Sequence, residues 1–295
     1  MFSHQMIVAA GACNLTCTYC YYVQGSSHYQ PLTASTAELV SWFERCAQAQ
    51  VPMEAASVTG GEPLLREDID DLLTVVADRF ASRTLLTNGL LVDRSRAQQL
   101  SDLDYRVHIS VDHISRELSD RVRGGTRAAW RGIDHLLDAG VGHVQIAMVV
   151  TGANWRDVGP VLDHAQGLGI HAEVIPVGVP RGHPLGLDRL SATERGHLLE
   201  VLDERAALWG TPRYRRGLST YVRTSRVRPI PRCAFIESSV FIDSDGSVHT
   251  CGQGQGTLGS IDDDPALIES RRMGAVLARR PARCATAGCL VLSEG

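Results

Sequence analysis

The chain has 295 residues, of which 44% are hydrophobic and 21% charged, and its formal net charge is −4. This length and composition are typical of a globular protein with a large core. The mild acidic excess argues against a nucleic-acid-binding protein, which usually carries a basic surface, and no apolar run reaches the roughly 18 residues of a membrane span. Because all 29 basic residues are arginine, lysine Schiff-base chemistry is excluded.

Alternating strands and helices are predicted from the N-terminus to residue 177. The segment MFSHQMIVAAGACNL has no basic residue before its apolar run, so we interpret it as a first strand and not a signal peptide, which predicts a cytoplasmic protein. Apolar runs predict strands at His4–Gly11, Ala55–Thr59, Thr84–Thr87, Arg106–Val111, His143–Val150 and Ala172–Val177. Amphipathic stretches predict helices at Ser35–Gln48, Glu67–Phe80, Arg94–Leu100, Arg127–Leu137 and Trp155–Gln166. This alternation is typical of a parallel sheet, and six such units predict a partial α/β barrel.

The second half of the chain contains a boundary, a connecting segment and a small module. Three glycines and two prolines in Val177–Gly186 indicate the boundary. Ser191–Trp209 predicts a helix, and the arginine-rich Arg213–Arg232 predicts an irregular surface connection, with a substrate-contacting loop as the alternative. The run SVFIDSDGSVHTC predicts a hairpin around an Asp-Gly turn, and Asp264–Arg280 predicts a helix. The predicted parts are therefore a barrel over residues 1–186, a connection over 187–232 and a cysteine-bearing module over 233–295.

Three of the eight cysteines follow the first predicted strand directly, at Cys13, Cys17 and Cys20. A structural zinc site uses four protein ligands, and a [4Fe–4S] cluster bonds four thiolates. A loop with three thiolates therefore leaves one iron open to an external ligand, as catalysis requires; a zinc knuckle is the alternative. Cys46 stands apart, at helical spacing from Leu39 and Phe43, and is predicted to be a buried core residue.

The segment Cys13-Asn-Leu-Thr-Cys17-Thr-Tyr19-Cys20 resembles the signature of the radical S-adenosylmethionine (SAM) superfamily. The resemblance implies a partial (β/α)6 barrel and a [4Fe–4S] cluster whose open iron chelates SAM. It also implies that one electron from the cluster cleaves SAM to a 5′-deoxyadenosyl radical, which abstracts hydrogen from a substrate.

Motifs at the ends of later strands resemble the cofactor-binding segments of this superfamily. Thr59-Gly60-Gly61-Glu62-Pro63 resembles the motif that hydrogen-bonds the amino group of SAM, and its glycines allow the backbone to approach a ligand closely. By the same resemblance Arg123 pairs with the SAM carboxylate, and a guanidinium suits that bidentate contact. The other residues implied to face the cofactor are Tyr19, Asn88, Ser110 and Asn154.

Four further cysteines occur near the C-terminus, at Cys233, Cys251, Cys284 and Cys289. Their layout resembles the twitch module, a short relative of the SPASM domain that carries one auxiliary [4Fe–4S] cluster. All four thiolates can serve as ligands, or Cys251 is an unligated thiol that faces the substrate and donates a hydrogen atom. A structural zinc site is the further alternative.

The compact layout resembles superfamily members that tailor aminoglycoside antibiotics, namely the epimerase of the neomycin pathway and the dehydrogenase of the butirosin pathway. This implies a cationic small-molecule substrate and an electron donor such as flavodoxin or ferredoxin, and it favours epimerisation over dehydrogenation. We expect no N-terminal peptide-recognition domain, which disfavours a third candidate, peptide modification. The predicted substrate contacts are Asp112, Glu173, Glu237 and Asp243, and Asp112 is also a candidate catalytic residue.

Overall fold

The computed structural model describes residues 1–20, 34–114, 122–226, 234–252 and 256–278. These residues form a sheet with strand order β6-β5-β4-β3-β2-β1-β7-β8-β9. Strands β1 to β6 are neighbours in chain order and run parallel, which confirms the predicted α/β class. They lie within two residues of the predicted positions, at His4–Ala10, Ala55–Gly60, Ser82–Thr87, Arg106–Ser110, His143–Val150 and His171–Pro176.

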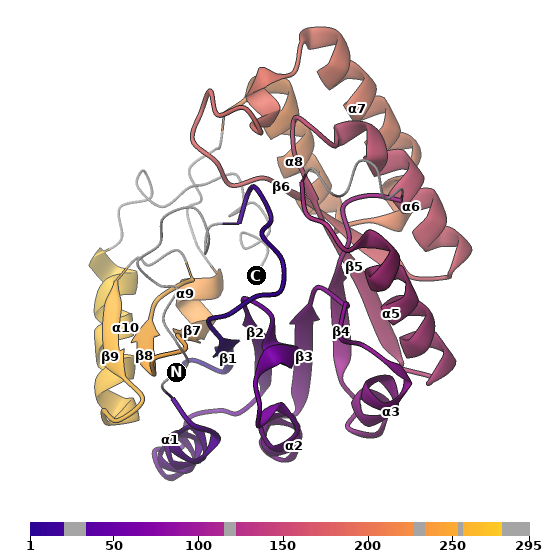
Figure 1. Ribbon diagram of the computed structural model, residues 1–295. Coiled ribbons are helices and arrows are strands. Elements are labelled where there is room, and N and C mark those ends of the chain that lie inside the picture. Colours follow the sequence, from indigo (N-terminus) through magenta and orange to yellow (C-terminus); the bar gives the residue numbers. More distant parts are fainter. Residues whose placement is uncertain (21–33, 115–121, 227–233, 253–255, 279–295) are drawn as a thin grey trace.

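Helices follow the strands and lie along the outside of the sheet (Figure 1). Their bounds are α1 Thr36–Gln48, α2 Ile69–Arg79, α3 Arg94–Asp102, α5 Thr126–Asp138, α6 Val158–Gly167, α7 Ala192–Glu204, α8 Pro212–Thr224, α9 Ala234–Ser238 and α10 Pro265–Ala278. Short 3-10 turns occur at Pro63–Leu65, Trp155–Asp157, Leu187–Arg189 and Ala206–Leu208. In the described residues, no helix is long and apolar enough to cross a membrane.

Helix α1 shows how the local sequence sets an element. Ser35 caps it and forms a capping box with Glu38, which satisfies backbone N–H groups that the first turn leaves unpaired. Its buried face includes Trp42, Phe43 and Cys46. Cys46 is fully buried, which confirms it as a core residue, and burial raises the pKa of its thiol to about 12.

The parallel strands have one apolar face and one mixed face. On the face beneath the helices, Val107, Ile146 and Val174 are fully buried. Neighbouring positions alternate to the other face, as strand geometry requires, and there His108, Gln145 and other half-buried polar side chains occur. We call this second face the inner face of the sheet. Because the strands are parallel, their C-terminal ends share one edge, which is where loops bind ligands in α/β folds.

The predicted hairpin is confirmed and continues the same sheet. Strands β7 (Ser239–Ile242) and β8 (Ser247–His249) pair antiparallel around the Asp-Gly turn, and Gly246 there has φ +82°. Strand β7 also pairs in parallel with β1, and β9 (Thr257–Ser260) extends the sheet beyond β8. The sheet thus joins the predicted C-terminal module to the barrel strands.

The prediction of an irregular connection at Arg213–Arg232 is wrong over its described part. Residues Pro212–Thr224 form α8, which Thr211 caps and which has a proline in its first turn. Tyr214, Leu218, Tyr221 and Val222 form its buried side at helical spacing, and the arginines lie between them.

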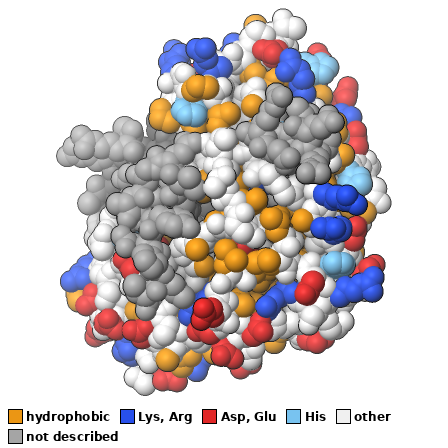
Figure 2. Space-filling model, in the orientation of Figure 1, with side chains coloured by type: hydrophobic (Ala, Val, Ile, Leu, Met, Phe, Trp, Pro, Cys, Tyr) orange, Lys and Arg blue, Asp and Glu red, His pale blue; other side chains and the backbone are white. Residues whose placement is uncertain are grey.

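Acidic side chains gather along the lower border of the face shown in Figure 2, where Figure 1 places α1 and α2. Asp70 of α2 is 65% exposed and pairs with Arg96. Part of the acidic excess of the chain therefore lies on solvent-exposed helix side chains.

Candidate active site at the cysteine loop

The loop that follows β1, residues 11–20, carries the three cysteines and is held by the end of β2. We call it the cysteine loop. Gly61 N–H donates to Ala10 O at 2.8 Å, and Glu62 N–H donates to Ala12 O at 2.8 Å. A Cβ atom on Gly60 would lie 2.4 Å from Ala10 O, and one on Gly61 would lie 2.3 Å from Ala12 O. These two glycines therefore let the backbone at the end of β2 approach the backbone of residues 10–12 closely.

The cysteine triad is held half-buried to buried at the edge where the parallel strands end. Cys17 is buried, and Cys13 and Cys20 are partly exposed. Burial raises the pKa of Cys13, and raises that of Cys17 to about 11 although Arg123 acts in the opposite direction. The Cys20 thiol adds to both shifts and the Cys13 thiol adds to that of Cys17, so these sulfurs lie within electrostatic range of one another.

The donor set of this loop fits a cluster better than a single ion. In the described part of the chain, no three His, Cys, Asp or Glu side chains are grouped as one metal ion requires. An iron–sulfur cluster differs because each thiolate bonds its own iron, so the sulfurs stand further apart than around one ion. Cys13, Cys17 and Cys20 are the described residues that could hold such a group.

Glu62 is fully buried beneath this loop and is fixed by three donors. Its Oε1 accepts from Thr87 Oγ1 at 2.7 Å and from Leu64 N–H at 3.1 Å, and its Oε2 accepts from Asn88 N–H at 2.8 Å. Burial raises the pKa of this carboxyl group, and the three hydrogen bonds oppose that shift. Because a carboxylate oxygen has two lone pairs, Oε2 keeps one acceptor position.

Asn88, at the end of β3, links this network to the cysteines. Its Nδ2 donates to Asn14 Oδ1 at 2.7 Å and lies 4.0 Å from Cys13 Sγ. The residue is 6% exposed. Glu62, Asn88 and Cys13, predicted from three separate motifs, are therefore brought into one contact chain.

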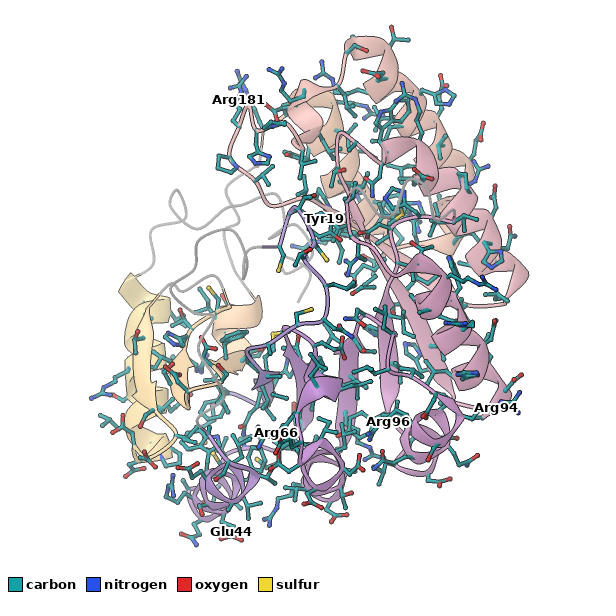
Figure 3. All side chains as sticks on the ribbon, in the orientation of Figure 1. Tyr19, Glu44, Arg66, Arg94, Arg96 and Arg181 are labelled. Atoms are coloured by element: carbon teal, nitrogen blue, oxygen red, sulfur yellow. The ribbon has the colours of Figure 1, made fainter. Side chains whose placement is uncertain are left out.

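Tyr19 and Asp112 form the other side of the site. The Tyr19 hydroxyl donates a short hydrogen bond to Asp112 Oδ2, which also accepts from Arg123 Nε at 2.8 Å. Asp112 Oδ1 accepts from Val149 N–H at 2.8 Å, so this buried carboxylate is shared by four chain segments. The Arg123 guanidinium lies 5.5 Å from the centre of the Tyr19 ring. Figure 3 labels Tyr19 beside the ends of the strands.

The remaining residues that were predicted to contact the cofactor have different surroundings. Ser110 is half-buried on the inner face at the end of β4, and Pro63 is buried at the start of a 3-10 turn. Asn154 is fully buried, and its amide bonds Thr151 N–H at 2.6 Å and Val149 O at 2.8 Å. In this structure Asn154 therefore fixes the turn after β5.

The four acidic residues predicted to contact substrate lie in four different surroundings. Asp112 is engaged by Tyr19 and Arg123, and Asp243 is buried in the hairpin turn, where it accepts from Ser244 N–H. Glu237 belongs to α9, and Glu173 lines a cavity beside β6.

Cys251 follows β8 and packs near the cysteine loop. Cys20 and Cys251 both pack against a small apolar cluster formed by Val8 of β1 and Phe241 of β7. A Cβ atom on Gly252 would lie 2.7 Å from the Phe241 ring, so the backbone next to Cys251 is pressed against that ring. The other predicted ligands of the C-terminal module, Cys233, Cys284 and Cys289, lie outside the described residues.

Two contacts that hold the cysteine loop and the strand before it had not been predicted. Thr18 N–H donates to Val122 O at 2.9 Å, which joins the loop to the segment before α5. Buried Arg66 donates to Ala9 O of β1 at 3.2 Å, Ala34 O at 3.3 Å and Thr36 Oγ1 at 2.9 Å, and so it joins β1 to the start of α1 (Figure 3). No local pattern signals either contact, because each joins segments far apart in the sequence.

Comparisons with known proteins place this site in a family. The model of the family described as "Radical SAM superfamily" matches residues 7–165. A probable GTP 3′,8-cyclase of Aeropyrum pernix is 28% identical over 68% of this chain and 56% of its own length. The Fe-coproporphyrin III synthase of Methanosarcina barkeri is 29% identical over 65% of this chain and 49% of its own length. The chain thus spans about half the length of these curated relatives.

A solved structure shows the same fold. Streptococcus suis SuiB bound to S-adenosylmethionine superposes with a TM-score of 0.70 at 16% identity, over 92% of this chain and 68% of that one.

Proposed function

The chain belongs to the radical SAM superfamily, and on this premise we propose that it epimerises a sugar carbon of a cationic aminoglycoside, with a thiol returning hydrogen to the opposite face. Family membership supports the SAM cofactor and one [4Fe–4S] cluster, which we assign to the cysteine triad. The names of the relatives indicate different substrates. The observation that carries the proposed reaction is that Cys20 and Cys251 both pack against the apolar pair Val8 and Phe241.

The cysteine triad holds the [4Fe–4S] cluster in this proposal, and the loop contacts position it. When bound, cluster and SAM together supply a 5′-deoxyadenosyl radical. The free acceptor position of Glu62 Oε2 suits the SAM ammonium, because the other three positions are taken by Leu64, Thr87 and Asn88. The Nε of Arg123 is committed to Asp112, which leaves its terminal nitrogens to pair with the SAM carboxylate.

Cys251 is proposed as the hydrogen donor. The substrate carbon radical needs a hydrogen donor on its other face, and a thiol S–H bond is weak enough to serve. The donation would leave a thiyl radical on Cys251, and one electron delivered through the auxiliary [4Fe–4S] cluster, with one proton from solvent, would restore the thiol. Cys251 is half-buried and packs against the apolar side chains of Val8 and Phe241. Cys20, a proposed ligand of the [4Fe–4S] cluster, packs against the same two side chains. This shared packing supports Cys251, which follows β8, as a donor that comes from a different strand than the triad.

An auxiliary [4Fe–4S] cluster remains part of the proposal. Cys233, Cys284 and Cys289, with or without Cys251, supply its thiolates, and an external donor such as flavodoxin or ferredoxin supplies electrons. Anaerobically reconstituted protein is expected to contain about eight irons and matching sulfide per chain, against about four for the triad alone. Zinc in place of iron would overturn this assignment.

The reaction is tested by incubating the reduced enzyme with SAM and neomycin-type aminoglycosides in D2O. One deuterium at one inverted carbon is expected, because a thiol exchanges with solvent before it donates. A ketone formed by two-electron oxidation would replace epimerisation with the dehydrogenase reaction. Turnover of a peptide and of no aminoglycoside would contradict the proposed substrate.

A further inference from the structure

A cavity of about 370 Å³ lies beside the edge strand β6, away from the cysteine loop. Gln145 and Glu173 line it from the N-terminal halves of β5 and β6, whereas the cysteine loop follows the C-terminal end of β1. The remaining lining residues are His171, Ala172, Gly210, Thr211 and Tyr214. A volume of this order accommodates a small organic molecule.

Glu173 is the unusual group in this cavity. Among the described residues it has neither an ion pair nor a hydrogen bond, and burial alone raises the pKa of its carboxyl group. None of the described residues that line the cavity is an arginine. A carboxylate withdrawn from water without a donor is destabilising, and a ligand that brings a positively charged donor removes that cost.

The nearby histidine does not supply that charge. His108 is the register partner of Gln145 on the inner face. Burial, followed by His143 and Arg106, lowers the pKa of His108 to about 4, so its ring is neutral near pH 7. His171 also lines the cavity but lies exposed at the start of β6, and no ion pair joins it to Glu173 in the described structure.

Tyr214 supplies an aromatic side chain to the cavity. Tyr214 is 4% exposed, donates its hydroxyl to Val174 O at 2.7 Å, and meets Trp209 edge-on at 6.2 Å between ring centres. Gly210 has φ +52°, and a Cβ atom there would lie 2.7 Å from Tyr214 Cδ1. The glycine therefore leaves room for the Tyr214 ring, which lines the cavity and can attract a cation there.

We propose that this cavity binds the protonated amino group of a small organic amine, with Glu173 as its counter-ion and the Gln145 amide as a hydrogen-bonding partner. The amine is either an amino group of the aminoglycoside substrate or a separate small amine. The site is formed by residues of β5 and β6 and by residues 210–214 at the start of α8, and so it is separate from the cysteine loop.

The proposal is tested by titration calorimetry of the full chain with 2-deoxystreptamine, a small diaminocyclitol, and with uncharged myo-inositol. The wild type is expected to bind the diamine and not the inositol. Glu173→Gln is expected to weaken binding by about tenfold or more, as loss of one charge pair implies. Glu200→Gln, on the exposed surface of α7, is expected to bind as the wild type does. Equal binding by Glu173→Gln, or no binding by the wild type, would overturn the proposal.

A second variant separates binding from folding. Gln145→Leu removes the amide and keeps the Glu173 carboxylate. It is expected to weaken 2-deoxystreptamine binding by a smaller factor than Glu173→Gln does, at an unchanged unfolding temperature. Binding of the diamine without any aminoglycoside turnover would reject the proposed reaction and leave this site standing. Where turnover occurs, a KM raised by 2-deoxystreptamine identifies the substrate amine as the occupant, and an unchanged KM identifies a separate amine.

Discussion

The hydroxyl of Tyr19 donates a hydrogen bond to Asp112, 93 residues further along the chain, and so ties the cysteine loop to the end of β4. Arg123, from a third segment, contacts both residues: it forms an ion pair with Asp112 and lies above the Tyr19 ring. The position of the thiolates thus depends on a buried polar contact as well as on the loop itself. A group of this kind is expected to fix one geometry for the loop.

Tyr19→Phe removes one hydroxyl and leaves the ring. Loss of a hydrogen bond to a charged group is expected to lower the free energy of unfolding by about 1.5 to 3 kcal/mol and to reduce iron retention. Tyr105→Phe is the control, because that buried hydroxyl donates to Leu73 O, a backbone carbonyl in α2. The control should lose about 1 kcal/mol and keep its iron. Full iron retention in Tyr19→Phe would contradict this role.

Gly61→Ala tests the packing of the β2 end against the cysteine loop. The new methyl group would lie 2.3 Å from Ala12 O, a backbone atom that moves only with the loop. We expect a loss of about 1 to 3 kcal/mol in unfolding free energy and a weakened cluster. Gly196→Ala in α7 meets nothing within 4 Å, so it is expected to stabilise the protein by up to about 1 kcal/mol. Equal cluster content and stability in both variants would reject the packing argument.

Cys251→Ser tests the hydrogen donor while keeping the size of the side chain. If the thiol donates hydrogen, the variant is expected to cleave SAM and abstract hydrogen but to form no inverted product. Iron analysis accompanies this assay, since a fall in iron would instead identify Cys251 as a cluster ligand. Cys46→Ala is the control: it is buried in α1 and should cost about 1 kcal/mol of stability without changing product or iron. Inverted product from Cys251→Ser would exclude this donor.

His108 predicts a pH dependence of stability. Because its pKa is lowered to about 4 in the folded protein, the unfolded chain binds a proton first as the pH falls below about 6.5. The contribution of His108 is therefore present above that pH and is lost between about pH 6.5 and 4. In urea unfolding, the free energy of unfolding is expected to fall less over this pH range in His108→Gln than in the wild type. His197→Gln, on the exposed side of α7, is the control for replacing a histidine; parallel curves for all three proteins would contradict the prediction.

The strands could be predicted from the sequence because each is a compact apolar run between turn residues. Helix α8 was missed because its arginines dominate the composition, yet the spacing of Tyr214, Leu218 and Tyr221 and the Thr211-Pro212 start are local signals of a helix. The parallel pairing of β7 with β1 has no such signal, since it joins strands from the two ends of the chain.

The sequence predicted which loops form the site. The motifs containing Cys13, Glu62 and Asn88 do meet, because the ends of parallel strands share an edge. The partners of individual side chains were not predictable. Asp112 looked available to a substrate, but tertiary pairing with Tyr19 and Arg123 occupies it, and only the folded chain brings these segments together.

The most direct test of the central claim is the formation of 5′-deoxyadenosine from SAM by anaerobically reconstituted, chemically reduced protein. We predict cleavage by the wild type and by Cys46→Ala, and none by Cys17→Ala, because three thiolates must hold the cluster while one iron stays open to SAM. A wild-type protein with a full cluster in the cysteine loop that leaves SAM intact, or cleavage that persists in Cys17→Ala, would contradict this account.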